Sequence, residues 1–520
     1  MLIIKKLFAA IFSLLTIASS VAAQDQQDIS MIRKYAENAF NGKDYEFALE
    51  NYLQLYKYDK NNIDLNFKIG ICYTETNIDK EKSIPFLEYV ASFNNKPIRT
   101  SYYLGRAYMY NYRFTEAIEA FYDYKTIGVD EAELLETDRM IEMCYYTLEL
   151  INVPKNVTFT RLDTTINTKY DDMLPVVTPD NSMLYFSSNS NYIKEYEDYI
   201  YSGFYSEMKK GGWQSALQIP ISSYDNEHVV GVSNDGNKIL IYANGDYATH
   251  DIKIYNRKGT KFTKAQASEL PADMNTEDIE MGACFSPDGN TIYYASNKPG
   301  GRGGLDLYTA KKGLDGKWGP SELMTSVINT EYDENYPSLS ADGKILYFAS
   351  KGHSGIGGYD IFRSYYDETT NSWTNPINIG FPINTPLDNT KISFTADGKV
   401  AYMAAKRKEG VGNLDVYRID FGDEEQQPSY YIGTVLVGEN ESTAVELTDQ
   451  FSKAYATVYD KFGNIYAQWV VEDGKFFASL FPGNYNLEVK FEGQTTGYKE
   501  SINIKEGDWI EKTIILKPVK

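Results

Sequence analysis

The chain has 520 residues and a net charge of −21, from 51 Lys and Arg against 72 Asp and Glu. This length predicts about three or four domains. The acidic excess argues against nucleic acid and anionic lipid as partners, because both are bound by clustered Lys and Arg. The hydrophobic fraction of 42% and charged fraction of 24% exclude wholesale disorder.

Residues 1–23 have the pattern of a secretory signal peptide. Lys5 and Lys6 precede the apolar stretch Leu7–Ile17, and Val21-Ala22-Ala23 supplies the small residues that signal peptidase cleaves after. No cysteine follows for lipid attachment, and no later run of about 18 apolar residues predicts a membrane-spanning helix. We therefore expect an exported, periplasmic protein.

Residues 24–152 predict paired helices with a period near 34. Small residues recur at Ala36, Gly70 and Gly105, where they would let two helices approach closely. The pattern resembles tetratricopeptide repeats, with three copies and a closing helix around Thr137–Leu150. Most of these apolar positions are expected to be plain core packing.

The resemblance also implies a concave groove lined by the first helix of each pair. Its predicted partner-binding residues are Arg33, Glu37, Phe67, Tyr102, Arg106 and Tyr110. Tyr and Arg are the residues that tend to dominate interface energies.

A longer repeat follows. An Asp recurs with steps of 55, 53, 54 and 55, and four of the five copies are followed by Gly. Asp-Gly before an apolar run predicts a hairpin with a type I′ turn. A second Asp comes 16 to 18 residues after each first one. The first positions are Asp180, Asp235, Asp288, Asp342 and Asp397, and the second are Asp198, Asp251, Asp306, Asp360 and Asp415.

These units predict a five-bladed β-propeller over residues 153–421, with four strands in each blade. The fifth unit ends without its last strand. We expect Val157–Leu162, with Phe159 in the equivalent place, to complete that blade and close the ring. Residues 422–429 are a polar linker, and the short alternating strands of 430–520 predict a small antiparallel β-sandwich. The predicted fold class is therefore multidomain, helical repeats followed by all-β domains.

A search for chemistry finds no nucleophile elbow, phosphate-binding loop or zinc spacing. The sequence therefore predicts no catalytic residue, no cofactor and no metal site. The three cysteines, Cys72, Cys144 and Cys284, are expected to be unpaired and buried. Asp306, Asp360 and Asp415 are expected to cap backbone N–H groups in glycine-rich turns, with calcium binding as the less favoured alternative.

One acidic constellation stands out. Asp172, Glu227, Glu280 and Glu334 each lie just before the inner strand of a blade, with Asn389 in the fifth position. In a closed ring they would circle one mouth of the channel and attract a cation or a basic partner. The alternative is a solvated rim without a role.

The blades, as in Tyr336-Pro337-Ser338-Leu339-Ser340-Ala341-Asp342-Gly343, resemble WD40-like repeats of the TolB type. The C-terminal zone, through Pro482-Gly483-Asn484-Tyr485, resembles carboxypeptidase-regulatory-like domains. The order of these parts resembles the PorE-type periplasmic component of the type IX secretion and gliding machinery of Bacteroidetes.

That family is expected to end in an OmpA-like peptidoglycan-binding domain, which does not appear in this chain, so direct cell-wall binding is not expected. The resemblance implies a non-enzymatic scaffold that binds protein partners and associates with the outer membrane through them. The alternative is a glycan- or peptide-binding propeller, or an accessory to an envelope hydrolase. Pull-down from envelope fractions would identify the partner.

Overall fold

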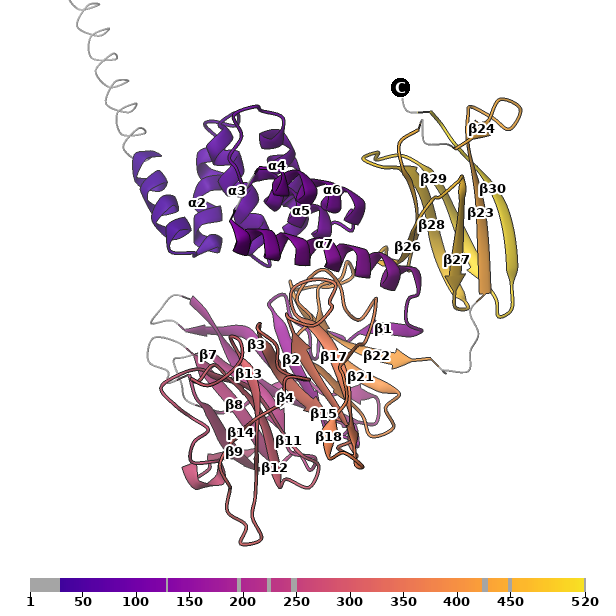
Figure 1. The fold of residues 1–520 in the computed structure, drawn as a ribbon. Coiled ribbons are helices and arrows are strands. Elements are labelled where there is room, and N and C mark those ends of the chain that lie inside the picture. The colour runs from indigo at the N-terminus through magenta and orange to yellow at the C-terminus, as the bar shows by residue number, and fades with distance from the viewer. Residues whose placement is uncertain are drawn as a thin grey trace, which may run out of the picture. The chain divides into compact units, whose positions relative to one another are not determined.

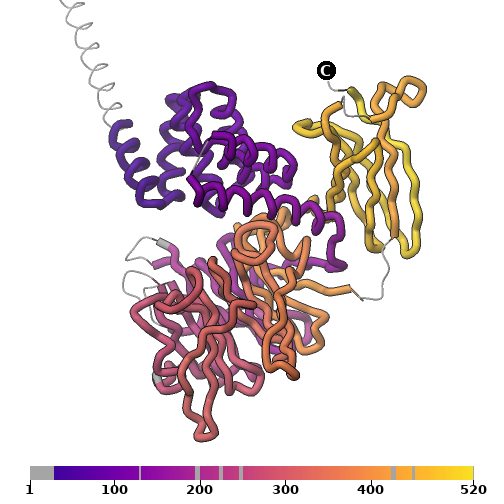
Figure 2. Tube along the Cα trace, in the orientation of Figure 1, coloured from indigo at the N-terminus to yellow at the C-terminus, as the bar shows by residue number. Residues whose placement is uncertain are grey.

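The computed structural model describes residues 29–127, 130–193, 198–221, 226–244, 250–422, 429–447 and 451–518. The chain divides into two compact units, Met1–Tyr145 and Tyr146–Lys520, and Figures 1 and 2 trace its path. The predicted signal peptide and most of the predicted linker lie outside the described residues. No helix of the described part is long and apolar enough to cross a membrane.

The first unit is helical, as predicted. Asp44 and Asn62 cap two of the helices by accepting hydrogen bonds from backbone N–H groups. A Cβ atom on Gly70 would lie 2.6 Å from Leu87 Cγ, and one on Gly105 would lie 2.6 Å from Phe121 Cε1. The predicted close approach of paired helices at these glycines is thus confirmed. The helices are residues 29–41, α2 (Tyr45–Tyr56), α3 (Ile63–Glu75), the short η1 (Lys80–Lys82), α4 (Ser83–Ala91), α5 (Thr100–Tyr110), α6 (Phe114–Lys125) and α7 (Glu131–Asn152).

The second unit contains five antiparallel sheets within residues 157–421 of the described part. In four of them the inner strand comes first and the following strands lie further out, whereas the fifth takes its outermost strand from the start of the region. Sheet I is β2 (Asp172–Val177), β3 (Met183–Ile193), β4 (Asp198–Lys209), β5 (Gly212–Trp213) and β6 (Leu217–Gln218). Sheet II is β7 (Asn226–Val232), β8 (Lys238–Asn244), β9 (Ile252–Lys258) and β10 (Lys261–Lys264), followed by η2 (Ala267–Glu269).

The remaining three sheets repeat the plan. Sheet III is β11 (Glu280–Phe285), β12 (Thr291–Ser296), β13 (Asp306–Lys311) and β14 (Glu322–Leu323). Sheet IV is β15 (Glu334–Leu339), β16 (Ile345–Ser350), β17 (Asp360–Asp367), β18 (Ser372–Trp373) and β19 (Ile377–Asn378). Sheet V is β20 (Ile392–Phe394), β21 (Val400–Ala405), β22 (Asp415–Phe421) and β1 (Val157–Arg161).

Sheet V joins the two ends of this region. β1 pairs with β22 in antiparallel register, with Phe159 opposite Ile419, and Figure 1 shows the two strands side by side. Phe159 also makes an edge contact with Tyr417, with ring centroids 6.2 Å apart. The prediction that the strand before the first unit completes the last one is confirmed.

The repeated Asp-Gly turns differ in detail from the prediction. The glycine has positive φ, +68° at Gly289, but Asp288 does not. The Gly289 N–H donates to Ser286 O, and Asp288 Oδ1 accepts from the Ser286 hydroxyl and from Asn290 N. This is a type I turn closed by a left-handed glycine. The same turn forms at Ser340–Gly343, where Ala341 replaces Pro287, because Asp342 Oδ1 also accepts from the serine hydroxyl and from the N–H two residues on. The predicted type I′ turn was wrong.

Asparagine amides link neighbouring sheets at four of the junctions, and three of the four asparagines are buried. Asn329, ahead of sheet IV, accepts from Leu307 N and donates to Leu307 O in sheet III. Asn167, ahead of sheet I, makes the same pair of bonds with Val416 in sheet V. Asn275 and Asn384 repeat the pattern at two further junctions. The bonds that the Asn167 amide makes between sheets V and I are therefore the same as those that Asn329 makes between sheets III and IV.

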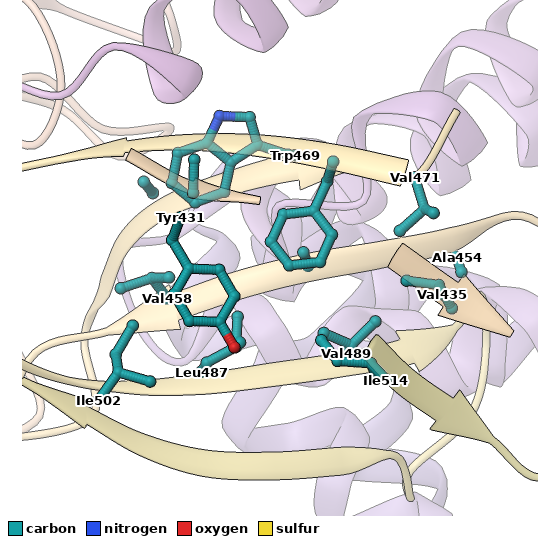
Figure 3. Packing of buried hydrophobic residues seen from close by; sticks show 14 of the residues in the cluster. Tyr431, Val435, Ala454, Val458, Trp469, Val471, Leu487, Val489, Ile502 and Ile514 are labelled. Atoms are coloured by element: carbon teal, nitrogen blue, oxygen red, sulfur yellow. The ribbon is translucent and has the colours of Figure 1, made fainter. Parts of the chain in front are cut away.

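The C-terminal part is a sandwich of two sheets around one apolar core. Figure 3 shows Val458, Leu487 and Ile514 among the side chains that fill it. One pairing departs from the predicted antiparallel arrangement, because β30 runs parallel to β23. The strands are β23 (Ser429–Val437), β24 (Val445–Glu446), β25 (Ala454–Tyr459), β26 (Ile465–Val470), β27 (Lys475–Leu480), β28 (Gly483–Phe491), β29 (Tyr498–Ile504) and β30 (Trp509–Leu516).

The asparagine links give a direct test of closure between sheets V and I. Asn167→Ala and Asn329→Ala each remove three equivalent bonds, including one to Leu162 O or Met324 O. Because buried backbone groups are left unpaired, we expect each to lower the free energy of unfolding by about 3 kcal/mol. Urea unfolding of both variants measures this. A near-neutral Asn167→Ala beside a costly Asn329→Ala would mean that the sheets do not close.

Candidate functional site

The inner strands of all five sheets converge on one pocket. Its walls come from β2, β7, β11, β15 and β20 and from the turns that follow them. Phe285, Phe394 and Leu339 supply large apolar surface, while Ser338 and Ser393 supply hydroxyl groups. No Asp or Glu lines it among the described residues. We call this the axial pocket, because each sheet contributes its innermost strand.

A buried lysine is the one cationic group in the lining of the axial pocket that the structure describes. Lys391 is only 2% exposed, and its ammonium donates a hydrogen bond of 3.0 Å to Pro337 O. Burial lowers the pKa of Lys391 to about 8, and no carboxylate of the described part offsets this effect. An ammonium has three protons to donate, and a buried charge without a counter-ion is costly. The pocket therefore has unused capacity for an anionic group.

Sequence reasoning missed Lys391, although a signal was present. It lies two residues after Asn389, in register with Leu174, Gly282 and Tyr336 of the other sheets. Leu174 and Tyr336 have positive φ values of 52° and 49°, in strands whose register shifts at that point. Such backbone strain in bulky residues is uncommon and clusters at functional sites. A side-by-side alignment of the five repeats would have shown a lysine among apolar residues.

The inner strands do not offer free backbone donors to an extended peptide at three positions that the structure describes. The Val177 N–H donates to Ser393 Oγ, and the Val229 N–H donates to Ser187 Oγ. The Gly282 N–H donates to Asn335 Oδ1. In each case the acceptor belongs to a neighbouring sheet, so these edges are already occupied by side chains. Strand addition needs such donors.

The predicted acidic mouth is not a solvent-facing ring. Asp172, Glu280 and Glu334 are fully buried, and Glu227 is 4% exposed. Asp172 Oδ2 accepts from the backbone and hydroxyl of Thr168. Glu334 accepts from Thr330 and from Ser350 of the adjacent strand, and Glu280 has the same kind of partners. The expectation of exposed carboxylates was wrong, because threonine and serine hydroxyls hold them inside the sheets.

Burial governs the titration of these acids. Desolvation raises the pKa of Asp172 to about 6 and that of Glu334 to about 7, although the bonds from Ser and Thr act in the opposite direction. The pKa of Glu280 is also raised by burial. In the fifth position, Asn389 Oδ1 accepts from Thr385 N as Asp172 Oδ2 does from Thr168 N. The amide side chain of Asn389 therefore takes the position that a carboxylate has in the other four sheets.

The second repeated Asp acts as predicted. One oxygen of Asp306 accepts from Arg302 N and Gly303 N, and Asp360 and Asp415 repeat this pair of bonds. Glycine is required there because a Cβ on Gly303 would lie 2.1 Å from Tyr332 O of the next sheet. No group of three or more metal-ligating side chains is assembled within the described residues.

The predicted groove residues of the helical unit fall into separate sets. Arg106 forms an ion pair with Glu75, donates to Tyr110 Oη at 3.2 Å and lies 5.9 Å from the Tyr102 ring. Glu37 accepts from Lys68 at 2.8 Å, Phe67 packs on the edge of Tyr103, and Arg33 is exposed on the first helix. The structure thus brings Tyr102, Arg106 and Tyr110 together, and their role in partner binding stays a prediction. All three cysteines are buried and free, as predicted.

Comparisons with known proteins bear on the fold. No family model matches the sequence, and a search of curated proteins finds no match. Among solved structures, a protein of Bacteroides uniformis assigned as a 6-phosphogluconolactonase is 15% identical, with a TM-score of 0.25, over 45% of this chain and 77% of that one. The α-L-arabinofuranosidase of Lactobacillus brevis is 11% identical, with a TM-score of 0.33, over 50% of this chain and 92% of that one.

A further similar structure is the α-L-arabinofuranosidase of Fusarium graminearum, at 11% identity and a TM-score of 0.31, over 52% of this chain and 97% of that one. By these comparisons, the predictions of a non-enzymatic scaffold and of a chain that is not an enzyme were wrong. Both predictions rested on the order of the domains and on the absence of short catalytic motifs from the sequence. Propeller sites are assembled from residues on separate sheets, which local motifs do not record. At these identities the likeness concerns the fold and assigns no activity.

The buried acids predict an unusual pH dependence. Since folded Asp172 holds its proton to higher pH than the unfolded chain, its contribution to stability falls as pH rises from about 4 to about 6 and stays low above that. Asp172→Asn, which imitates Asn389, should be neutral near pH 4 and stabilise by up to about 3 kcal/mol at pH 7.5. Chemical unfolding at both pH values measures the difference.

The matched control is Asp315→Asn, whose carboxylate is 62% exposed and which should show no such trend. An effect of Asp172→Asn that is the same at both pH values would contradict the conclusion that burial raises the pKa of the Asp172 carboxyl.

Proposed function

We propose that this chain is a saccharide-binding propeller protein whose axial pocket takes a carboxylate-bearing sugar. The observation that carries the proposal is Lys391, a buried ammonium without a carboxylate partner in the described part of the chain. We also propose the finer fold on which it depends, a five-bladed ring of sheets I–V preceded by tetratricopeptide-like helices, in an exported protein.

The chemistry of the pocket supports an acidic ligand. A carboxylate placed against Lys391 would receive a charge-assisted hydrogen bond in a site of low dielectric, where such bonds are stronger than in water. It would also offset the cost of the buried ammonium.

The rest of the lining supports a sugar over a peptide. A sugar ring presents apolar C–H faces and many hydroxyls, which suit Phe285 and Phe394 together with the Ser338 hydroxyl. An extended peptide would need free N–H groups along an inner strand, and Val177, Val229 and Gly282 have theirs bonded to side chains. Uronic acids combine a ring of this kind with a carboxylate.

Binding of tetragalacturonate, measured by calorimetry, tests the proposal. Lys391→Met keeps the volume of the side chain and should weaken binding about tenfold to a hundredfold, since it removes one charge-assisted bond. Lys264→Met removes an exposed lysine of β10 and is the matched control, which should bind as the wild type does. Neutral galactotetraose and a tetrapeptide with a free C-terminus are the comparison ligands.

The affinity should also depend on pH. Because Lys391 has a pKa of about 8, tetragalacturonate should bind more weakly at pH 9.5 than at pH 6.5, and Lys391→Met should remove that difference. Equal binding by wild type and Lys391→Met, or a preference for the tetrapeptide, would contradict a saccharide site at Lys391.

A further inference from the structure

One hairpin of sheet I is longer than its counterparts. β3 has 11 residues, whereas β12 and β16 have six each. The extra residues continue the pairing with β4 beyond a register shift, with Tyr192 directly opposite Tyr199. The hairpin therefore extends past the level at which the other sheets turn, on the side where the inner strand β2 begins.

This extension displays a cluster of tyrosines. The Tyr192 and Tyr199 rings have centroids 5.0 Å apart, and Tyr170, two residues ahead of β2, lies 4.7 Å from Tyr199. Tyr192 is 48% exposed and Tyr199 is 42% exposed. The exposed Lys169 ammonium lies 5.0 Å from the Tyr170 centroid. We call Tyr170, Tyr192 and Tyr199 the tyrosine platform.

The platform is held in place by hydrogen bonds at its base. Tyr201 Oη donates to Asp171 Oδ2 at 3.1 Å, and the Asp171 N–H donates to Asn189 Oδ1 at 2.8 Å. The segment that carries Tyr170 is thus fastened to both strands of the hairpin. Rigid, amphipathic tyrosines contribute contact area at a low cost in conformational entropy.

We propose that the tyrosine platform is a second contact for an acidic saccharide chain, with sugar rings stacked on the exposed tyrosines and a carboxylate near Lys169. This inference rests on the proposed function and extends it to a ligand class, a polyuronate longer than the pocket can hold. Local charge complementarity selects the acidic sugar, because the exposed Lys169 places a cation beside the Tyr170 ring.

The two contacts are well separated. The platform adjoins the start of β2, while Pro179, just beyond the end of β2, lines the axial pocket. At about 3.3 Å per residue, Tyr170 and Pro179 are up to about 30 Å apart along the strand. A tetrasaccharide is too short to reach both, so its affinity reports on the axial pocket alone, whereas a long polyuronate has further sugar rings that can contact the platform.

The test compares tetragalacturonate with polygalacturonate on the full chain. The double variant Tyr192→Ala with Tyr199→Ala should lose about tenfold in affinity for the polymer and keep its affinity for tetragalacturonate. Tyr192→Phe with Tyr199→Phe keeps the rings and should restore polymer binding. Tyr365→Ala removes a tyrosine that is 37% exposed on β17, and it should change neither affinity.

A second measurement needs no substitution in the platform. In Lys391→Met, polygalacturonate should still protect Tyr192 and Tyr199 from nitration by tetranitromethane, read by peptide mass spectrometry. Protection without dependence on Lys391 would support the platform even if the pocket proposal failed. Unchanged polymer affinity in the double alanine variant, together with nitration that the polymer does not slow, would overturn the platform and leave these tyrosines to another kind of contact.

Discussion

The amide of Asn167 is the interaction on which the arrangement of the propeller-like region depends. It joins the segment ahead of sheet I to Val416 in sheet V, across 249 residues of sequence. The pairing of β1 with β22 acts at the same junction. These contacts join the last sheet to the first in the same way as the sheets between them are joined. The five inner strands then face a common pocket, and Lys391 lies in its lining.

The buried carboxylates of that region and the buried Lys391 differ in the partners that the protein supplies. Carboxylates near the start of the inner strands are hydrogen-bonded locally, by threonine four residues before them and by serine on the next strand. Their raised pKa values follow from burial without a cation. Lys391 is the reverse case, since its ammonium has a single carbonyl partner among the described residues. A group that lacks compensation inside the protein is the natural place for a ligand to supply it.

Much of the fold could be predicted from the sequence because its determinants are local and repeated. The Asp-Gly spacing located the hairpins, and Phe159 located the strand that completes sheet V. The turn type was missed because it depends on the Ser or Thr two residues before each Asp, whose hydroxyl donates to the carboxylate, and not on Asp-Gly alone. The acids were misplaced because their burial depends on Thr168, Thr330 and Ser350, which lie at fixed spacings but were not included in the pattern.

The candidate site was the least predictable part. Each sheet contributes one or a few residues to the axial pocket, and none of these segments resembles a motif by itself. The order of parts favoured a scaffold, and this was wrong because order does not record what the inner strands place on the axis. The helical unit contributes Tyr102, Arg106 and Tyr110 as one cluster, and its function is a separate question.

A crystal structure of the full chain with tetragalacturonate tests the central claim most directly. The account predicts electron density for a sugar in the axial pocket, with one carboxylate oxygen about 3 Å from Lys391 Nζ and a ring face against Phe285 or Phe394. An empty axial pocket at saturating ligand, or a bound sugar whose carboxylate points away from Lys391, would contradict it.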